Sequence, residues 1–322
     1  MTEPTLNYLS CPDANAGHRM AYWQWGSPDA GHVVVCVHGL SRQGRDFDVL
    51  AQGLCDAAQN LPAGAATGIR VICPDVAGRG ASDWLKDPMG YQLPVYAADM
   101  LVLLAHLQAQ APIKTLDWVG TSMGGLIGIV VASVSTLPRV SAPGLPPGIE
   151  LLAPVRKLVL NDVGPSIEWQ AIVRIGMYLG QAGEFESVQL AADAMWAIST
   201  GFGPHTPAQW LALSQPMLKP LSSAPNSKVR LHYDPAIALP FKQVTEEATK
   251  QGSAMLWQLY DGIKAQTLLL RGADSDLLST DTAHAMTQRG PRASLVEFAG
   301  VGHAPTLVAD DQVKTVVDFL LG

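Results

Sequence analysis

Ser122 has the setting in this sequence that most clearly predicts chemistry. It lies in Gly-Thr-Ser-Met-Gly, between the apolar run TLDWV and the helix-like run GGLIGIVVASV. A serine on such a sharp turn from strand to helix projects its hydroxyl from the carboxyl end of the strand, beside the N–H groups of the first helical turn. Glycines on both sides leave room for this turn. We therefore predict that Ser122 is a nucleophile.

A serine hydroxyl is a weak nucleophile at neutral pH, so it needs a histidine base. The chain has eight histidines. His303, in AGVGHAP, directly follows the last strand-like run, and we predict it as the general base. His38 begins the segment HGL and is expected to shape that loop. The others have no comparable setting and are expected to pack or to face solvent: His18, His32, His106, His205, His232 and His284.

An aspartate must orient the histidine, and three follow strand-like runs. Asp162 stands in NDVG, and Asp274 and Asp276 stand in RGADSDLLS after the run QTLLL. All three are expected at the carboxyl edge of the sheet, the edge that carries Ser122. A purely structural interpretation has Asp162 capping backbone and Asp274 forming a turn.

Negative charge on a tetrahedral intermediate requires two backbone N–H donors. The residue after the nucleophile, Met123, is expected to supply one donor. The other is expected from the loop that follows VVVCV, where Gly39 permits a bend. We predict Leu40 as the second donor.

Two further polar segments have a structural and a functional interpretation. Arg45–Asp48 either caps the following helix, with Asp46 in its first turn, or places polar groups at the mouth of a pocket. Arg79, in AGRG, is expected to fix a loop by hydrogen bonding to backbone.

A parallel sheet covered by helices is needed to bring these residues together. Short apolar runs alternate with segments of helical periodicity, and most runs are continuously apolar, which indicates strands buried on both faces. LNYLSC and RMAYWQWG predict an antiparallel hairpin at the sheet edge. The predicted strands are 33–37, 70–76, 115–120, 157–163, 266–272 and 294–300. The predicted helices are 46–59, 94–110, 124–135, 280–289 and 309–321. Two Pro/Gly-rich segments, 60–68 and 137–148, predict surface loops.

Between Asp162 and about Gln266 the alternation stops, and proline-punctuated helical stripes replace it. This pattern predicts a strand-free helical cap over 164–264, inserted into a core domain formed by 1–163 and 265–322. Several large side chains of the insert either line a pocket or pack the cap itself: Met177, Met195, Trp196, Trp210 and Met217.

The composition excludes several classes of function. With 322 residues, 48% of them hydrophobic, the chain can bury a large core, and its net charge of −7 argues against nucleic acid or anionic membranes as partners. The N-terminus lacks the features of a secretory signal, so a cytoplasmic location is expected. The four cysteines lack metal-ligand spacing, and Cys36 and Cys73 are expected to be buried thiols. No nicotinamide fingerprint or zinc spacing is present, so we expect neither cofactor nor metal.

Six segments occur in an order that resembles the α/β-hydrolase fold superfamily, and within it small bacterial esterase-like hydrolases with a helical lid. They are VVVCVHGL, VICPDVAGRGASD, WVGTSMGG, LVLNDVGP, LLLRGADSDLL and GVGHAP. The resemblance implies a mostly parallel eight-stranded sheet, helices on both faces, and a cap inserted after strand 6. It also favours Asp276 as the acid, with Asp274 and Asp162 as second choices. Haloalkane dehalogenases and epoxide hydrolases of this fold carry an aspartate where this chain has Ser122, which argues against those reactions.

The leading hypothesis is a serine hydrolase that cleaves small carboxylic esters through an acyl-enzyme, acting as a monomer or a homodimer. The same residues are compatible with carbon–carbon bond hydrolysis of meta-cleavage-type products, with lactone opening or with acyl transfer. A ligand receptor or an inactive scaffold is the alternative from another class, which an intact serine, histidine and aspartate set disfavours.

Overall fold

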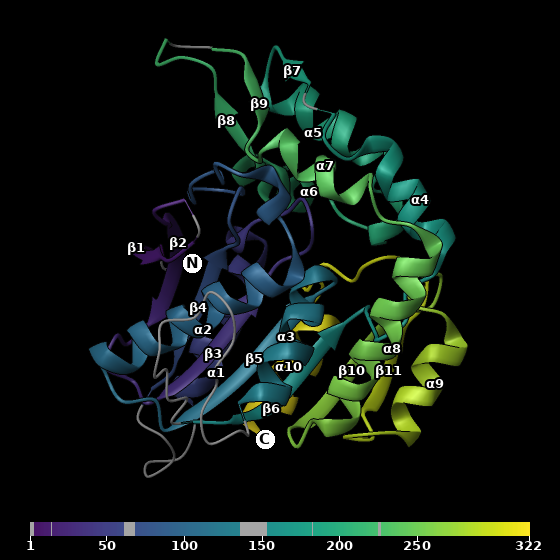
Figure 1. Ribbon diagram of the computed structural model, residues 1–322. Coiled ribbons are helices and arrows are strands. Elements are labelled where there is room, and N and C mark those ends of the chain that lie inside the picture. The colour runs from purple at the N-terminus through teal and green to yellow at the C-terminus, as the bar shows by residue number, and fades with distance from the viewer. Residues whose placement is uncertain (1–2, 14, 61–67, 136–152, 182, 225–226) are drawn as a thin grey trace.

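Eight strands form one twisted sheet in the computed structural model, which describes residues 3–13, 15–60, 68–135, 153–181, 183–224 and 227–322. The strand order is β1-β2-β4-β3-β5-β6-β10-β11 (Figure 1). Strands β1 and β2 form an antiparallel edge hairpin, β2 pairs antiparallel with β4, and the remaining pairs are parallel. The expected mostly parallel eight-stranded sheet is confirmed. The expected loops at 60–68 and 137–148 lie almost entirely outside the described residues.

The strands coincide closely with the apolar runs of the sequence. Alternate residues of one strand enter different cores: Val33 and Val35 pack on one face of the sheet, and Val34 on the other. Burial on both faces explains why these strands are continuously apolar. The bounds are β1 Thr5–Cys11, β2 His18–Gly26, β3 His32–Val37, β4 Arg70–Asp75, β5 Thr115–Thr121, β6 Val155–Asn161, β10 Gln266–Gly272 and β11 Ser294–Phe298.

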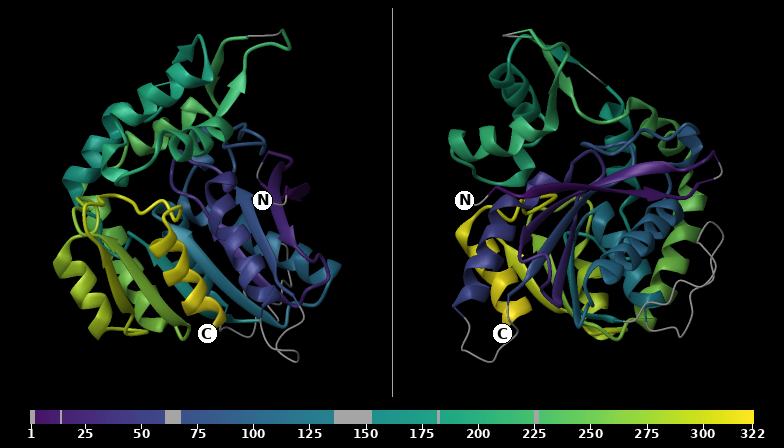
Figure 2. Two further views of the ribbon diagram at one scale, coloured as in Figure 1. Left: turned by 180° about the vertical axis from the view of Figure 1, so that it is seen from behind. Right: turned by 90° about the vertical axis from the view of Figure 1, so that its left-hand side faces the viewer.

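Helices cover both faces of the sheet. On one face α2 (Leu93–Gln110), α3 (Met123–Val134) and α8 (Glu246–Gly262) pack beside one another. On the other face lie α1 (Asp48–Gln59) and α10 (Asp310–Leu321), seen from behind in Figure 2. Helix α9 (Thr280–Gln288) packs beside β11. The predicted layers on both faces are therefore present.

The segment between β6 and β10 forms a layer above the carboxyl ends of the strands (Figures 1 and 2). It holds a three-stranded sheet in the order β7-β9-β8, so the expectation of a strand-free insert is wrong. Strands of two or three residues are too short to show a period of two in the sequence. The elements are α4 Trp169–Tyr178, β7 Glu184–Phe185, α5 Val188–Ala197, α6 Pro207–Ser214, β8 Leu218–Pro220, β9 Val229–Leu231 and α7 Ala238–Phe241.

Helix α8 ends this segment but packs with the sheet. Its Tyr260 is fully buried in the core on this face of the sheet, and its hydroxyl donates a hydrogen bond to the Met286 carbonyl of α9. By packing, α8 is thus part of the helical layer on the sheet rather than of the layer above it. Five short 3₁₀ helices complete the described elements: Gly44–Phe47, Pro88–Gly90, Thr200–Phe202, Gln215–Met217 and Pro235–Ile237.

All four cysteines are buried and free. Burial raises the pKa of Cys73 well above its usual range, in agreement with the expectation of buried, unreactive thiols. Among the helices of the described residues, none combines the length and the hydropathy that a membrane-spanning segment needs.

Candidate active site

Ser122 lies on a sharp turn between β5 and α3. Its backbone has φ 52° and ψ −117°, a conformation that L-residues rarely adopt. The turn requires glycine on both sides, because a Cβ on Gly124 would lie 1.9 Å from the Val37 carbonyl oxygen and one on Gly120 would lie 2.3 Å from the Gly124 carbonyl oxygen. The strand therefore passes directly into the helix, and the strained residue presents its hydroxyl to the pocket.

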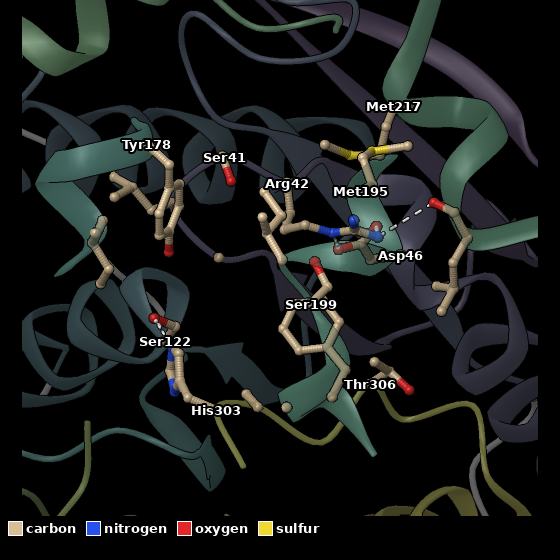
Figure 3. A pocket seen from close by; sticks show the side chains of 18 of the residues that line it. Ser41, Arg42, Asp46, Ser122, Tyr178, Met195, Ser199, Met217, His303 and Thr306 are labelled. Atoms are coloured by element: carbon tan, nitrogen blue, oxygen red, sulfur yellow. Dashed lines mark hydrogen bonds and ion pairs between the residues drawn. The ribbon is translucent and has the colours of Figure 1, made fainter. Parts of the chain in front are cut away.

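His303 joins Ser122 to a buried aspartate. Its Nε2 lies 2.9 Å from Ser122 Oγ, and its Nδ1 lies 2.7 Å from Asp162 Oδ2 (Figure 3 shows the pair formed with Ser122). The loop that carries His303 is held by Asn161, whose side-chain amide donates to the Pro305 carbonyl at 2.8 Å. In this arrangement Nδ1–H donates to the carboxylate while Nε2 is free to accept the serine proton.

Asp162 begins the connection that leaves β6, and its carboxylate is fully buried. Oδ1 accepts the Gly272 N–H at 2.8 Å, and Oδ2 accepts the Ser275 hydroxyl at 2.6 Å. Both donors come from the end of β10 and the turn after it. They fix the carboxylate toward His303.

The preferred acid of the sequence analysis, Asp276, does not reach His303, so that prediction is wrong. Both of its oxygens accept hydrogen bonds from Arg174 of α4, each at 2.8 Å, and its side chain is 53% exposed. The turn after β10 directs Ser275 toward Asp162, and the next residue then faces α4. Asp274 is exposed and lines the pocket. The aspartate beside His303 is Asp162, one of the two second choices.

Of the expected oxyanion donors, Met123 directly follows Ser122 and Leu40 lies on the loop after β3. Met123 begins α3, where the first N–H groups have no partner within the helix. The loop after β3 passes closely over the serine, since a Cβ on Gly39 would lie 3.7 Å from Ser122 Cβ. Leu40 follows on this loop and lines the same pocket as Ser122.

His38 holds the loop that carries Leu40, as expected. It is fully buried, with Nδ1 2.7 Å from the Gly39 carbonyl oxygen and Nε2 accepting the Val76 N–H at 2.9 Å. Burial lowers the pKa of His38 to about 3. A neutral ring with its proton on Nδ1 satisfies both contacts and connects the loop after β3 to the end of β4.

The pocket over Ser122 has a volume of about 650 Å³ and lies between the sheet and the layer above it (Figure 3). Two of the large side chains singled out in the sequence, Met195 and Met217, line it. The others do not: Met177 is 67% exposed, whereas Trp196 and Trp210 pack against each other with ring centroids 4.9 Å apart.

An ion pair also lines the pocket wall. Arg42 donates to both oxygens of Asp46, at 2.6 and 2.7 Å, and reaches the Leu213 carbonyl at 3.3 Å (Figure 3). Burial raises the pKa of Asp46, against the opposing effect of Arg42. Asp46 lines the pocket, as the functional interpretation of the segment 45–48 expects. The expected cap is not formed, because no side chain caps α1, and Arg45 instead pairs with Asp48, the first residue of that helix.

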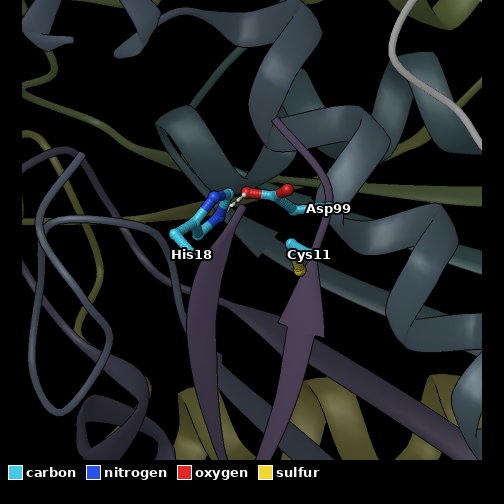
Figure 4. A group of neighbouring side chains, drawn as sticks. All are labelled: Cys11, His18 and Asp99. Carbon is cyan, nitrogen blue, oxygen red and sulfur yellow. Dashed lines mark hydrogen bonds and ion pairs between the residues drawn. The ribbon is translucent and has the colours of Figure 1, made fainter. Parts of the chain in front are cut away.

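A second cluster lies outside the pocket. Strand pairing brings Cys11 opposite His18, and Asp99 of α2 approaches both, with the potential ligand atoms of all three within 4.8 Å of one another (Figure 4). Each ring nitrogen of His18 faces a carboxylate, Asp99 at 3.0 Å and Asp13 at 3.2 Å. Burial alone would lower the pKa of His18, but these hydrogen bonds raise it. An imidazolium satisfies both carboxylates and connects the edge hairpin to α2.

Comparisons with known proteins agree with this architecture. The sequence matches the model of the "Alpha/beta hydrolase family" over residues 34–318. A 3-hydroxybutyrate-oligomer hydrolase from Cupriavidus necator is 43% identical over 319 residues, which cover 99% of this chain and 98% of that protein.

Solved structures show the same relationship. An α/β hydrolase from Novosphingobium aromaticivorans is 31% identical, with a TM-score of 0.76 and coverage of 100% of this chain and 99% of that one. A protein from Rickettsia typhi is 27% identical, with a TM-score of 0.78 and coverage of 98% of this chain and 99% of that one. The chain therefore belongs to the alpha/beta hydrolase family and is a hydrolase.

Proposed function

We propose that the protein hydrolyses carboxylic esters through an acyl-enzyme formed on Ser122. The observation that carries this proposal is the unbroken chain of hydrogen bonds from Asp162 through His303 to Ser122. A neutral histidine between a buried carboxylate and a serine hydroxyl is the arrangement that acyl transfer requires.

In the proposed reaction, His303 Nε2 takes the proton of Ser122 as Oγ attacks the ester carbonyl carbon. The N–H groups of Leu40 and Met123 hold the resulting oxyanion. His303 then returns the proton to the leaving alkoxide, which departs as the alcohol. A water molecule, deprotonated by the same nitrogen, attacks the acyl carbon; the bond to Oγ then breaks, His303 returns the proton to Ser122 Oγ, and the acid is released. Asp162 stabilises the imidazolium in both steps.

For the substrate we propose short oligoesters of hydroxy acids, the class on which the relative from Cupriavidus necator is named to act. The pocket supports this choice because it combines methionine side chains with a guanidinium. Met195 and Met217 offer apolar surface for methyl-bearing repeats. Arg42 lines the same wall; its Nε and Nη2 bind Asp46, which leaves its Nη1 to donate to a second ester carbonyl.

The test compares hydrolysis of 3-hydroxybutyrate dimer and trimer by the wild type and three variants. Ser122→Ala should abolish turnover. Asp162→Asn should lower kcat by about a thousandfold or more, because the histidine loses its orienting charge. Asp276→Asn is the matched comparison and should lower kcat far less.

Titration of the released acid measures the turnover of the wild type and the three variants, and circular dichroism checks that each protein is folded. If the loss caused by Asp276→Asn equals or exceeds that caused by Asp162→Asn, the assignment of the acid is wrong. If the wild type cleaves neither the oligomers nor p-nitrophenyl butyrate, the proposed function itself is wrong.

A further inference from the structure

A buried arginine lies directly behind the two proposed oxyanion donors. Arg79, in the loop after β4, has no exposed surface. Its Nε donates to the Leu40 carbonyl at 2.9 Å, and its Nη2 lies 3.7 Å from Met123 Sδ. The expectation that Arg79 fixes a loop through backbone contacts is therefore confirmed, and that loop is the one that carries Leu40.

The remaining contacts of the Arg79 guanidinium are neutral. Its Nη1 donates to the Ala77 carbonyl at 2.7 Å and to the Tyr96 hydroxyl at 2.9 Å. The rings of Tyr96 and Tyr91 lie 4.9 and 5.7 Å from its Cζ. None of the ion pairs found among the described residues includes Arg79. A guanidinium keeps its positive charge even when buried. This charge therefore lies behind the loop that carries Leu40, here called the oxyanion loop, without a carboxylate in an ion pair with it.

The Arg79 loop is also held from its other side. The backbone of Arg79 forms a β-bridge with Tyr233, the Gly80 N–H donates to the His232 carbonyl at 3.0 Å, and the Asp234 N–H donates to the Gly78 carbonyl at 2.7 Å. Residues 232–234 belong to the layer above the sheet. The guanidinium therefore sits in a loop fixed between that layer and the oxyanion loop.

We propose that Arg79 is a positioning residue that holds Leu40 and Met123 in the geometry of an oxyanion hole and, through its unneutralised charge, favours the oxyanion over the neutral ester. This inference rests on the proposed function of Ser122. An N–H donor that already points at the oxyanion position before the reaction stabilises the tetrahedral intermediate without reorganisation. A nearby positive charge acts strongly on the oxyanion where water is excluded. Arg79 acts through Leu40 and Met123 and is not expected to touch the substrate.

The test uses Arg79→Met and Arg79→Lys with p-nitrophenyl butyrate. Arg79→Met should lower kcat by about 10- to 100-fold. This decrease is no larger than the one expected when a direct oxyanion donor is removed. KM should change by less than about twofold, because the ground-state ester carries no charge to stabilise. Arg79→Lys should recover part of kcat, since the charge returns without the planar fork that reaches Leu40.

Arg70→Met is the matched control. Arg70 is equally buried, and its Nη2 donates to the Ala111 carbonyl at 3.2 Å. It begins β4, whereas the loop of Arg79 leaves the opposite end of that strand. Its loss should reduce thermal stability without lowering kcat per folded molecule. Folded fractions come from thermal unfolding, and active serines are counted by burst titration with p-nitrophenyl acetate.

Equal losses of kcat in Arg79→Met and Arg70→Met would overturn the proposal, as would a loss confined to KM. If Arg79→Met does not fold, Tyr96→Phe replaces it: removing the Nη1 partner should lower kcat more than KM, and unchanged kcat contradicts the inference. Failure of the wild type to turn over any ester contradicts the function of Ser122 instead, so the two failures are distinguishable.

Discussion

At the scale of single residues, the site depends on buried groups that are held by specific polar partners. Asp162 and His38 are fully buried, and each is hydrogen-bonded to a neighbouring backbone group. His38 fixes the loop of Leu40, while Asp162 fixes the ring of His303. Both act by holding other groups in place, so their loss should be visible as changes in turnover or stability rather than in substrate affinity.

His38 makes the stability of the protein sensitive to acid. Its pKa is lowered to about 3 in the folded state, mainly by burial, whereas the unfolded chain titrates near 6.5. Between these values the unfolded state binds the extra proton, so the free energy of unfolding should fall as pH decreases from 6.5 toward 3, with a limiting slope of about 1.4 kcal/mol per pH unit.

Urea unfolding at about pH 7, above this window, and at about pH 5.5 and 4.5, within it, measures the change in the free energy of unfolding. His38→Asn removes the titrating ring and should give a shallower dependence on pH, from a lower starting stability at neutral pH. An unchanged dependence would show that His38 does not titrate as inferred.

At the scale of elements, the junction of β5 and α3 is the most tightly constrained part of the site. The carbonyl oxygens of β3 approach the first turn of α3 so closely that a side chain at Gly124 has no room. Helix α3 is then anchored by Trp118, whose indole N–H donates to the Gly124 carbonyl at 3.2 Å. Strand, turn and helix thus form one rigid unit beneath Ser122.

Gly124→Ala should therefore destabilise the fold by about 3 kcal/mol or more, because its Cβ would lie 1.9 Å from a backbone oxygen that cannot move aside. Gly252→Ala provides the control. Gly252 lies within α8 and a Cβ there meets nothing within 4 Å, so this change should stabilise the protein by about 0.5–1 kcal/mol. Chemical denaturation measures the free energy of unfolding of both variants. Equal changes of the same sign would contradict the inferred lack of space at Gly124.

At the scale of the whole molecule, the pocket exists because the layer between β6 and β10 covers the carboxyl edge of the sheet. Polar contacts connect the two parts around the cavity: Arg174 of α4 binds Asp276 after β10, and Arg42 reaches the Leu213 carbonyl of α6. We propose that the layer is a cap that shapes the substrate site, with the sheet domain supplying the chemistry.

Arg174→Gln tests this role of the cap. The Arg174–Asp276 pair is exposed, so its loss should change the free energy of unfolding by less than about 1 kcal/mol. KM for a 3-hydroxybutyrate trimer should nevertheless rise about threefold, equivalent to a loss of about 0.6 kcal/mol in binding, while kcat for p-nitrophenyl butyrate stays the same. Steady-state kinetics on both substrates supply the comparison, and a fall in kcat on the small ester would place Arg174 in the chemistry instead.

The order of the residues alone was enough to predict the sheet, its edge hairpin and the turn at Ser122. These features depend on local sequence patterns. Continuous apolar runs predict buried strands, and glycines around a serine predict one specific turn. The loop positions of His303 and Leu40 followed from the strands before them. Each depends on residues that are near one another in the chain.

The aspartate that lies beside His303 is evident only in the folded protein, because all three candidates follow strands and differ only in the direction of the side chain after the strand ends. Asp162 is fixed by donors at the end of β10 and in the turn after it, more than a hundred positions away in sequence, and Asp276 pairs with Arg174 instead. The placement of Arg79 behind Leu40 is likewise a contact between loops that no local pattern encodes. Long-range packing sets these choices, since backbone conformation and neighbouring strands together determine the direction of each side chain.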